Sequence, residues 1–194
     1  MRIELLEGPA DLQGVTPAVD FGAIVSSARL LETMARNLAS GSVIAAALDD
    51  GGQLNGYATV TAIEPLWRRF AGLAGVVELG AIEVARSARR RGIASALLAR
   101  LDGHAPLADL VTLTYGASSH WEPEVGGLSW DRYRRMLVRL LGRAQFVVQD
   151  TDDPEVLEHP PNFLAARFGT NAPATAMFEV LSRLHEERVL ASAG

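Results

Sequence analysis

The sequence predicts an α/β fold in one domain spanning residues 1–194, with a mixed, mostly antiparallel central sheet flanked by helices. Runs of β-branched and apolar residues alternate along the chain with segments of helical periodicity, which is typical of this class. A length of 194 residues, 48% of them hydrophobic, suits one domain with its own core. No repeat, low-complexity tract or Pro/Gly-rich linker divides the chain.

The first third of the chain predicts a helix followed by a β-hairpin. Apolar residues recur at helical spacing from Ser26 to Ser40, and Gly41 ends the pattern. A short apolar run, Ser42 to Leu48, is separated from a second run, Leu54 to Ile63, by the turn sequence Asp49-Asp50-Gly51-Gly52. Two such runs joined by a Gly- and Asp-rich turn indicate a hairpin.

The middle of the chain predicts a strand that leads through an arginine-rich turn into a helix. The run Val76 to Val84 has the composition of a strand. It is followed by Arg89-Arg90-Arg91, and from Gly92 to Leu101 apolar residues recur at helical spacing.

The second half predicts three more strands and two more helices. The expected strands cover 109–115, 145–149 and 163–168, and the expected helices cover 130–141 and 174–190. Between them, Asp150 to Pro154 should turn the chain, and His159-Pro160-Pro161 should prevent regular structure.

Two absences restrict the chemistry. The chain has no cysteine, which excludes disulfides, thiolate metal sites and a cysteine nucleophile. All 18 residues of the combined Lys and Arg count are Arg, which excludes a P-loop lysine, Schiff-base chemistry and a lysine base. The four histidines, at 104, 120, 159 and 185, have no metal-ligand spacing, so no metal is expected.

The charge balance argues against a nucleic-acid or membrane-surface protein. The formal net charge is −5 at pH 7, whereas both kinds of partner call for a basic surface. No apolar run is long enough to span a membrane, and Glu4, Glu7 and Asp11 lie where a signal peptide would be basic and then apolar. We expect a soluble, cytoplasmic protein.

The turn Arg89-Arg90-Arg91-Gly92-Ile93-Ala94 is a candidate phosphate-binding site. The first amides of a helix have no intrahelical partners and lie at the positive end of the helix dipole. Gly92 and Ala94 would leave these amides accessible, and the flanking guanidinium groups would add charge-assisted contacts. A solvated arginine run is the alternative, but three cations beside a positive dipole end are unfavourable unless an anion compensates them.

In these residues the chain resembles the GCN5-related N-acetyltransferase (GNAT) superfamily, whose acetyl-CoA loop reads Arg/Gln-x-x-Gly-x-Gly/Ala after its fourth strand. The resemblance implies that the loop amides from Arg89 to Ala94 bind the pyrophosphate and that the strand ending at Val84 binds the pantetheine. Many members carry Pro two residues after that Val, whereas this chain has Arg86.

Further motifs from His120-Trp121 to Ala166-Arg167-Phe168-Gly169 resemble the acetoin utilization branch of that superfamily. This resemblance implies acetylation of a protein lysine, on acetyl-CoA synthetase, which switches that enzyme off. Without cysteine, transfer would be direct, in a ternary complex with acetyl-CoA. Surface aromatic residues would suit a homodimer.

Two carboxylates are candidates for the base that deprotonates the amine. Glu78 lies eleven residues before Arg89, the separation found in superfamily members with a glutamate base. On an unbroken strand Glu78 shares a face with Val84, and Glu83, the reserve candidate, points the other way. Either could instead be an ordinary strand carboxylate.

A tyrosine is the expected acid for the leaving thiolate. Tyr133 lies on the helix after the fifth strand, where the superfamily often has its tyrosine, and Tyr115 ends that strand. A core role with the hydroxyl at the surface is the alternative reading of Tyr133.

For the acceptor we expect His120, Trp121, Asp153 and His159 to contribute, since acidic residues would attract a lysine-bearing loop and histidine can transfer protons at neutral pH. Three other functions stay open at this point: a small-molecule amine acetyltransferase, a non-catalytic acetyl-CoA sensor, and a nucleic-acid binder using Arg89 to Arg91 and Arg132 to Arg135. The net charge makes the last the least favoured.

Overall fold

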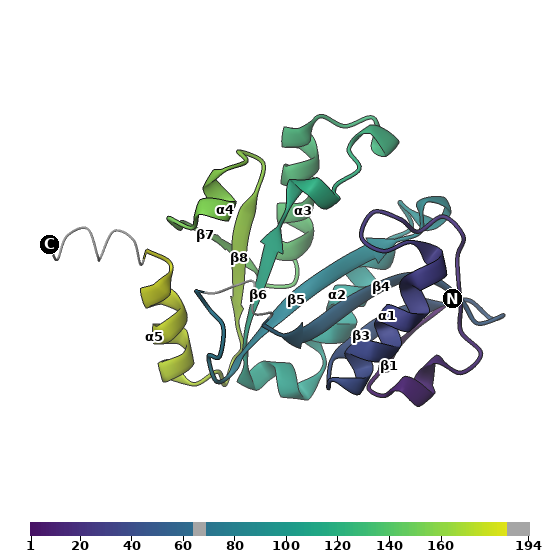
Figure 1. Cartoon of the computed structure of the whole chain (residues 1–194), viewed down its shortest axis with the longest axis horizontal. Helices are drawn as coiled ribbons and strands as arrows, with labels where there is room; N and C mark the ends of the chain where they lie inside the picture. The colour runs from purple at the N-terminus through teal and green to yellow at the C-terminus, as the bar shows by residue number, and fades with distance from the viewer. Residues whose placement is uncertain (64–68, 186–194) are drawn as a thin grey trace, which may run out of the picture. The chain divides into compact units, whose positions relative to one another are not determined.

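The computed structural model describes residues 1–63 and 69–185 (Figure 1). Its strands are β1 (Arg2–Leu6), β2 (Thr16–Pro17), β3 (Val43–Leu48), β4 (Gln53–Ala62), β5 (Val76–Val84), β6 (Val111–Gly116), β7 (Val147–Gln149) and β8 (Phe163–Phe168). Its helices are α1 (Ser27–Ala39), α2 (Ile93–Asp102), α3 (Trp130–Gly142), α4 (Pro154–Leu157) and α5 (Ala174–Arg183).

The strands form one eight-stranded mixed sheet. The hydrogen-bonded order is β1-β3-β4-β5-β6-β8-β7, and β2 pairs with β4. The pairs β2/β4 and β5/β6 are parallel, whereas β1/β3, β3/β4, β6/β8 and β7/β8 are antiparallel. The expected α/β class with a mostly antiparallel sheet is confirmed.

The chain divides into two compact units, and β5 contributes residues to both. The first unit comprises residues 1–62 and 79–104, and the second comprises 63–78 and 105–194. The single domain expected over residues 1–194 stays a prediction.

The first unit is built around the hairpin of β3 and β4, in which Val43 pairs with Val60 and Ala46 with Tyr57. Ile44 to Ala47 on β3 are completely buried, and because successive strand residues point to opposite faces, both faces of β3 are covered. Helix α2 packs on β1, β3 and β4, and α1 packs on β2 and β3. A side chain at Gly56 would meet Ile93 Cγ2 at 2.9 Å, so glycine allows this close approach of α2.

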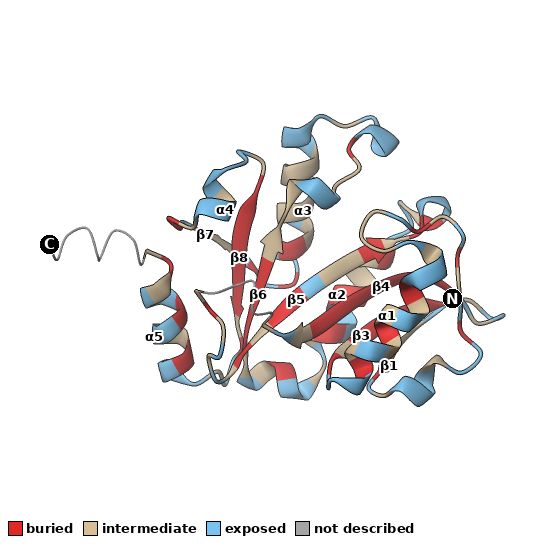
Figure 2. Ribbon diagram, in the orientation of Figure 1, coloured by how far each residue is buried: buried red, intermediate tan, exposed pale blue. Residues whose placement is uncertain are grey.

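The second unit has its core between the sheet and α5 (Figure 2). Val111 and Leu113 of β6, Leu164 of β8 and Val180 of α5 are essentially inaccessible to solvent and belong to one apolar cluster. Strand β8 is central in this unit because it pairs with β6 on one side and with β7 on the other. Burial on both sides explains its almost continuous apolar sequence.

The expected element boundaries are met most closely where apolar runs end at turn residues. Strands β5 and β8 have the expected bounds. The β3/β4 hairpin and the helices α1, α2, α3 and α5 are all present, and each starts within a few residues of its expected start. Helix α5 ends at Arg183, and the part of the expected helix over 186–190 lies outside the described residues.

Two expectations need correction. Strand β1, which pairs with β3 from Arg2↔Leu48 to Leu6↔Ile44, was not expected, because its alternating charges hide a short edge strand. The turn expected at 150–154 leads into the short helix α4, for which Asp153 Oδ1 accepts a hydrogen bond from the Glu155 N–H at 3.0 Å. Pro154 is tolerated at the first helical position because no amide hydrogen is needed there.

Candidate active site

The turn between β5 and α2 has a backbone shape suited to an anion. Arg90 and Gly92 both have left-handed conformations, with φ of 65° and 77°. Gly92 is the N-cap of α2, and the first intrahelical bond runs from the Ala96 N–H to the Gly92 carbonyl at 3.0 Å. The amides of Ile93 and Ala94 therefore precede the helical ladder and lie at the positive end of the helix dipole.

The space in front of this turn is open. A Cβ added at Gly92 would find no atom within 4 Å, and Arg90 and Arg91 are exposed. Ile93 is 2% exposed, and its apolar side chain packs inside the first unit, so the side chain takes no part in a phosphate site. Arg89 is half-buried, and its Nε donates to the Val84 carbonyl at 3.1 Å, so it links the end of β5 to the turn.

Glu83 is a buried anchor for the segment before α1. Its Oε1 accepts hydrogen bonds from the backbone N–H groups of Gly22 at 2.9 Å and Ala23 at 2.8 Å, and its Oε2 accepts one from the Tyr57 hydroxyl at 3.1 Å. Burial raises the pKa of Tyr57 well above its usual range, and the negative charge of Glu83 adds to this. The donors around Glu83 are structural groups, so the geometry assigns this carboxylate to positioning.

Asp20 connects the same segment to the turn between β5 and α2. Its Oδ2 accepts a hydrogen bond of 2.6 Å from the Ser87 N–H, just before Arg89. Partial burial raises the pKa of Asp20, but the hydrogen bonds from Ser87 and the charge of Arg86 outweigh it, and the pKa is lowered overall. Sequence reasoning missed Asp20, since 67 residues separate it from Ser87 and nothing local indicates the pairing.

Glu78 lies on β5 at the end of its ladder with β6. The two strands pair from Val76↔Val111 to Glu78↔Leu113, and β5 continues to Val84. Glu78 is buried, with 8% of its surface exposed. Because five residues separate it from Glu83, the two carboxylates point to opposite faces of an unbroken strand.

The two candidate tyrosines have different surroundings. The Tyr115 hydroxyl donates to the Glu155 carbonyl at 2.5 Å and accepts from Asn162 Nδ2 at 2.8 Å, so it joins β6 to α4. Burial and the nearby charge of Glu155 raise the pKa of Tyr115 to about 12. Tyr133 is half-buried on α3, and its ring stacks on Trp121 with a centroid distance of 5.5 Å.

Trp121 lies in the middle of an aromatic cluster. It also contacts Trp130 and Phe163, at centroid distances of 6.3 and 6.1 Å. The guanidinium of Arg134 lies 5.5 Å from the centre of the Phe163 ring, as in a cation–π contact. The cluster fixes the orientation of α3 through its inner face. It also brings Trp121 and Tyr133 into contact, which the sequence motifs around these two residues did not indicate.

The remaining acceptor candidates are spread over the second unit. His120 and His159 are exposed, each in a loop or short 3-10 turn, and no contact joins them. Asp153 is half-buried, caps α4 and lies with its Oδ2 3.7 Å from Arg69 Nε.

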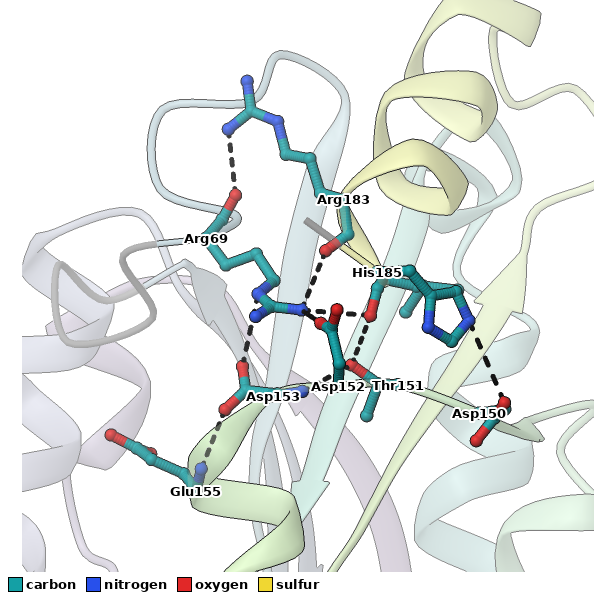
Figure 3. A network of polar contacts seen from close by, with 9 residues as sticks. Arg69, Asp150, Thr151, Asp152, Asp153, Glu155, Arg183 and His185 are labelled. Carbon is teal, nitrogen blue, oxygen red and sulfur yellow. Dashed lines mark hydrogen bonds and ion pairs between the residues drawn. The ribbon is translucent and has the colours of Figure 1, made fainter. Parts of the chain in front are cut away.

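Arg69 is the centre of a buried polar network that the sequence did not reveal (Figure 3). Its Nη1 donates to Asp152 Oδ1 and to the carbonyls of Arg183 and Leu184, at 3.2 and 3.0 Å to the latter two. The Thr151 hydroxyl donates to the same Leu184 carbonyl at 2.7 Å. The network binds the end of α5 to the loop that carries Asp153.

The candidates thus divide between the two units. Val84, Glu83 and the turn from Arg89 to Ala94 belong to the first, and Glu78, Tyr133 and the acceptor candidates belong to the second. Within residues 1–63 and 69–185, no group of three or more His, Asp or Glu side chains is arranged to hold a metal ion. In the same part of the chain, no helix is long and apolar enough to cross a membrane.

Comparison with known proteins gives a consistent result. Residues 19–117, just over half of the chain, match the family model described as acetyltransferase (GNAT) family. The acetoin utilization protein AcuA of Bacillus subtilis is 31% identical over 175 residues, covering 86% of this chain and 81% of that protein. AcuA of Bacillus licheniformis is 34% identical over 119 residues, covering 59% and 55%.

Solved structures agree on the fold. The crystal structure of an acetoin utilization protein from Exiguobacterium sibiricum superimposes with a TM-score of 0.88 at 24% identity, covering 97% of this chain and 91% of that one. A phosphinothricin acetyltransferase from Sinorhizobium meliloti, solved with AcCoA, gives a TM-score of 0.53 at 19% identity, with coverages of 90% and 92%. The chain therefore belongs to the acetyltransferase (GNAT) family and is an N-acetyltransferase.

Proposed function

We propose that the enzyme transfers an acetyl group from acetyl-CoA to a lysine side chain of a protein, by direct transfer in a ternary complex. The observation that carries the donor half is the β5–α2 turn, where left-handed Gly92 has open space in front of it and the amides of Ile93 and Ala94 precede the helical ladder. A pyrophosphate at this position would gain both the amide hydrogen bonds and the helix dipole.

The donor would extend from this turn along β5. Arg90 and Arg91, both exposed, would pair with phosphate oxygens, and Arg89 would brace the turn through its bond to Val84. Strand β5 runs on past Glu78, its last residue paired with β6, to Val84. An extended pantetheine would add to this part of the strand by backbone hydrogen bonds.

Glu78 is our candidate for the base and Tyr133 for the acid. The lysine ammonium would lose a proton to Glu78, directly or through water, and its nitrogen would form a bond to the thioester carbonyl carbon. As the carbon–sulfur bond breaks, the departing thiolate would take the Tyr133 hydroxyl proton, and the second proton lost by the attacking nitrogen as the amide forms would return to the tyrosinate through water. Glu83 is less suited as a base, since both of its oxygens accept bonds from buried structural donors.

A protein acceptor is favoured by the similarity to AcuA and by the chemistry of the second unit. Exposed His120 and His159, together with Trp121 and Asp153, would contact a lysine-bearing loop. By its resemblance to the acetoin utilization branch, acetyl-CoA synthetase is the first acceptor to test.

Calorimetric titration with acetyl-CoA tests the donor site. We expect saturable binding to the wild type and its loss in the triple variant Arg89→Ala/Arg91→Ala/Gly92→Glu, with circular dichroism as the check that the variant is folded. Equal binding in both proteins would contradict the phosphate site.

Mass spectrometry of acetyl-CoA synthetase after incubation with enzyme and acetyl-CoA tests the acceptor. Because this enzyme has no lysine, every acetyl-lysine detected belongs to the acceptor. If free polyamines were acetylated and the synthetase were not, a protein acceptor would be contradicted. Acetyl-CoA binding without transfer to any acceptor would indicate a sensor.

A further inference from the structure

Helix α3 carries a basic stripe along one exposed face. Arg132, Arg135, Arg139 and Arg143 are spaced three, seven and eleven residues from the first, which places them on one side of a helix with 3.6 residues per turn. All four are exposed, and Met136, 42% exposed, lies on the same side. We call these five residues the α3 stripe.

The stripe is uncompensated. None of its guanidinium groups forms an ion pair or side-chain hydrogen bond within residues 1–63 and 69–185. Residues 130–143 contain five arginines against one aspartate, Asp131, although the whole chain has a net charge of −5. Like charges three or four residues apart destabilise a helix by about 0.2–0.5 kcal/mol per pair. Within the helix, Asp131, four residues before Arg135, and the helix dipole at Arg139 offset part of this repulsion.

The inner face of α3 shows that the remaining arginine has a structural role. Arg134 points toward Phe163, and Tyr133 stacks on Trp121, so these residues fix the helix to the second unit. These ring and cation–π contacts involve none of the stripe residues. Its charge is therefore available to something outside the chain.

The composition of the stripe is that of a protein interface. Arginine, methionine and aromatic residues are enriched at protein–protein contacts, whereas lysine is depleted. Trp130, at the start of α3, is 46% exposed and adds an aromatic group to the same helix. An apolar residue between arginines suits a partner that offers carboxylates around an apolar contact.

We propose that the α3 stripe is the docking surface for an acidic face of the acceptor protein. This proposal rests on the proposed protein acceptor and adds the chemistry by which that acceptor is recruited. Aspartate and glutamate side chains of the acceptor pair with Arg132, Arg135, Arg139 and Arg143, and Met136 packs between these pairs. Docking at a surface built of charge raises the association rate and makes recruitment depend on ionic strength.

The test measures binding and transfer separately, with acetyl-CoA synthetase as the probe. The variant Arg132→Glu/Arg139→Glu reverses two charges of the stripe, and Arg132→Ala/Arg139→Ala removes them while favouring the helix. The matched control, Arg29→Glu/Arg36→Glu, reverses two exposed arginines at the same spacing on α1.

We expect the stripe variants to weaken synthetase binding about tenfold or more, to raise its KM, and to leave kcat and acetyl-CoA affinity unchanged. Binding of the wild type should weaken as salt rises from about 50 to 300 mM, and the charge-reversal variant should lose this dependence. The control should behave as the wild type.

Four results would overturn the proposal. Two of them are the absence of synthetase binding to the wild type and an equal loss of binding in the control. A loss of acetyl-CoA affinity in the stripe variants would assign the stripe to donor binding, and a change from dimer to monomer would assign it to contact with a second copy of the chain. Stripe-dependent binding without lysine acetylation would refute the proposed function and leave docking intact. Acetylation that the stripe variants do not slow would refute docking and leave the function intact.

Discussion

The Tyr57 hydroxyl donates a hydrogen bond of 3.1 Å to Glu83 Oε2, in a region of the first unit where Tyr57 is 3% exposed and Glu83 4%. The same carboxylate also accepts the amides of Gly22 and Ala23, so one ionised group holds together β4, β5 and the segment before α1. The three hydrogen bonds stabilise the fold together, and removal of the carboxylate leaves three buried donors without an acceptor.

Replacing this carboxylate should therefore destabilise the protein more than removing one donor. We expect Glu83→Ala to lower the free energy of unfolding by about 2–3 kcal/mol, and Tyr57→Phe by about 1 kcal/mol. Urea denaturation followed by circular dichroism measures both. If Glu83→Ala were as stable as the wild type but inactive, Glu83 would be catalytic after all.

Gly92 offers a clean separation of strain from binding. Gly92→Ala places a Cβ at φ 77° in open space, which costs about 1–2 kcal/mol of backbone strain and obstructs the approach of a phosphate. Gly41→Ala is the control, since Gly41 has φ 86° and equally open surroundings outside the turn. Calorimetry should show acetyl-CoA affinity reduced only in Gly92→Ala, although both variants lose similar stability.

Glu78→Gln should separate chemistry from binding. As the proposed base, Glu78 should contribute about 10²-fold or more to kcat, because the glutamine amide cannot accept the proton. Acetyl-CoA affinity should stay within about twofold of the wild type, since donor binding is assigned to the turn. The exposed Glu124→Gln is the control and should leave kcat unchanged. Full activity in Glu78→Gln would remove Glu78 from the mechanism.

The lowered pKa of Asp20 predicts an acid-sensitive contribution to stability. Because the folded-state pKa lies below the unfolded value of 3.8, the contribution is complete above that value and is lost as pH falls through the folded pKa. Asp20→Asn keeps an acceptor for the Ser87 amide but removes the charge. Thermal melts should show the wild type more stable than Asp20→Asn at pH 7 and the two converging below about pH 3. A constant difference across this range would contradict the role of the charge.

The buried pair of Arg69 and Asp152 should be far more sensitive than an exposed one. Their side chains are 9% and 8% exposed, so Asp152→Asn should cost about 2–4 kcal/mol by leaving the buried Arg69 charge with only the more distant carboxylate of Asp153, at 3.7 Å. Glu179→Gln, which removes an exposed pair with Arg183 at 3.5 Å, should cost under about 0.5 kcal/mol. Replacement of both partners by apolar residues, in Arg69→Met/Asp152→Leu, should recover much of the stability lost in Asp152→Asn. If all three variants lowered the free energy of unfolding equally, the buried pairing would be contradicted.

Local pattern determines much of this fold. Strands β5 and β8 could be predicted to the residue, because an uninterrupted apolar run ending at turn residues has few alternatives. Strand β1 could not, because its charged positions face outward at the edge of the sheet and its pairing with β3 joins residues far apart in sequence. The four-residue α4 is too short to leave a periodic signal and depends on its cap at Asp153.

The turn between β5 and α2 was predictable for the same reason, since Arg89 to Ala94 contain a glycine and the helix start in one contiguous stretch after the strand. The anchors around it were not. Asp20 meets Ser87 across 67 residues, and Arg69 meets Asp152 across 83, so only the folded chain brings these charges together. The separate surroundings of Tyr115 and Tyr133 likewise depend on Asn162 and Trp121, which no motif connects to them.

The α3 stripe has one more consequence, which follows from its being built of arginine alone. A guanidinium stays protonated throughout the physiological range and presents no nucleophilic lone pair, so it cannot become an acetyl acceptor. Lysines in the same positions could be acetylated by an enzyme that transfers acetyl groups to lysine, and each acetylation would remove one positive charge from the docking surface. An arginine stripe keeps its charge, because the enzyme cannot acetylate its own docking surface.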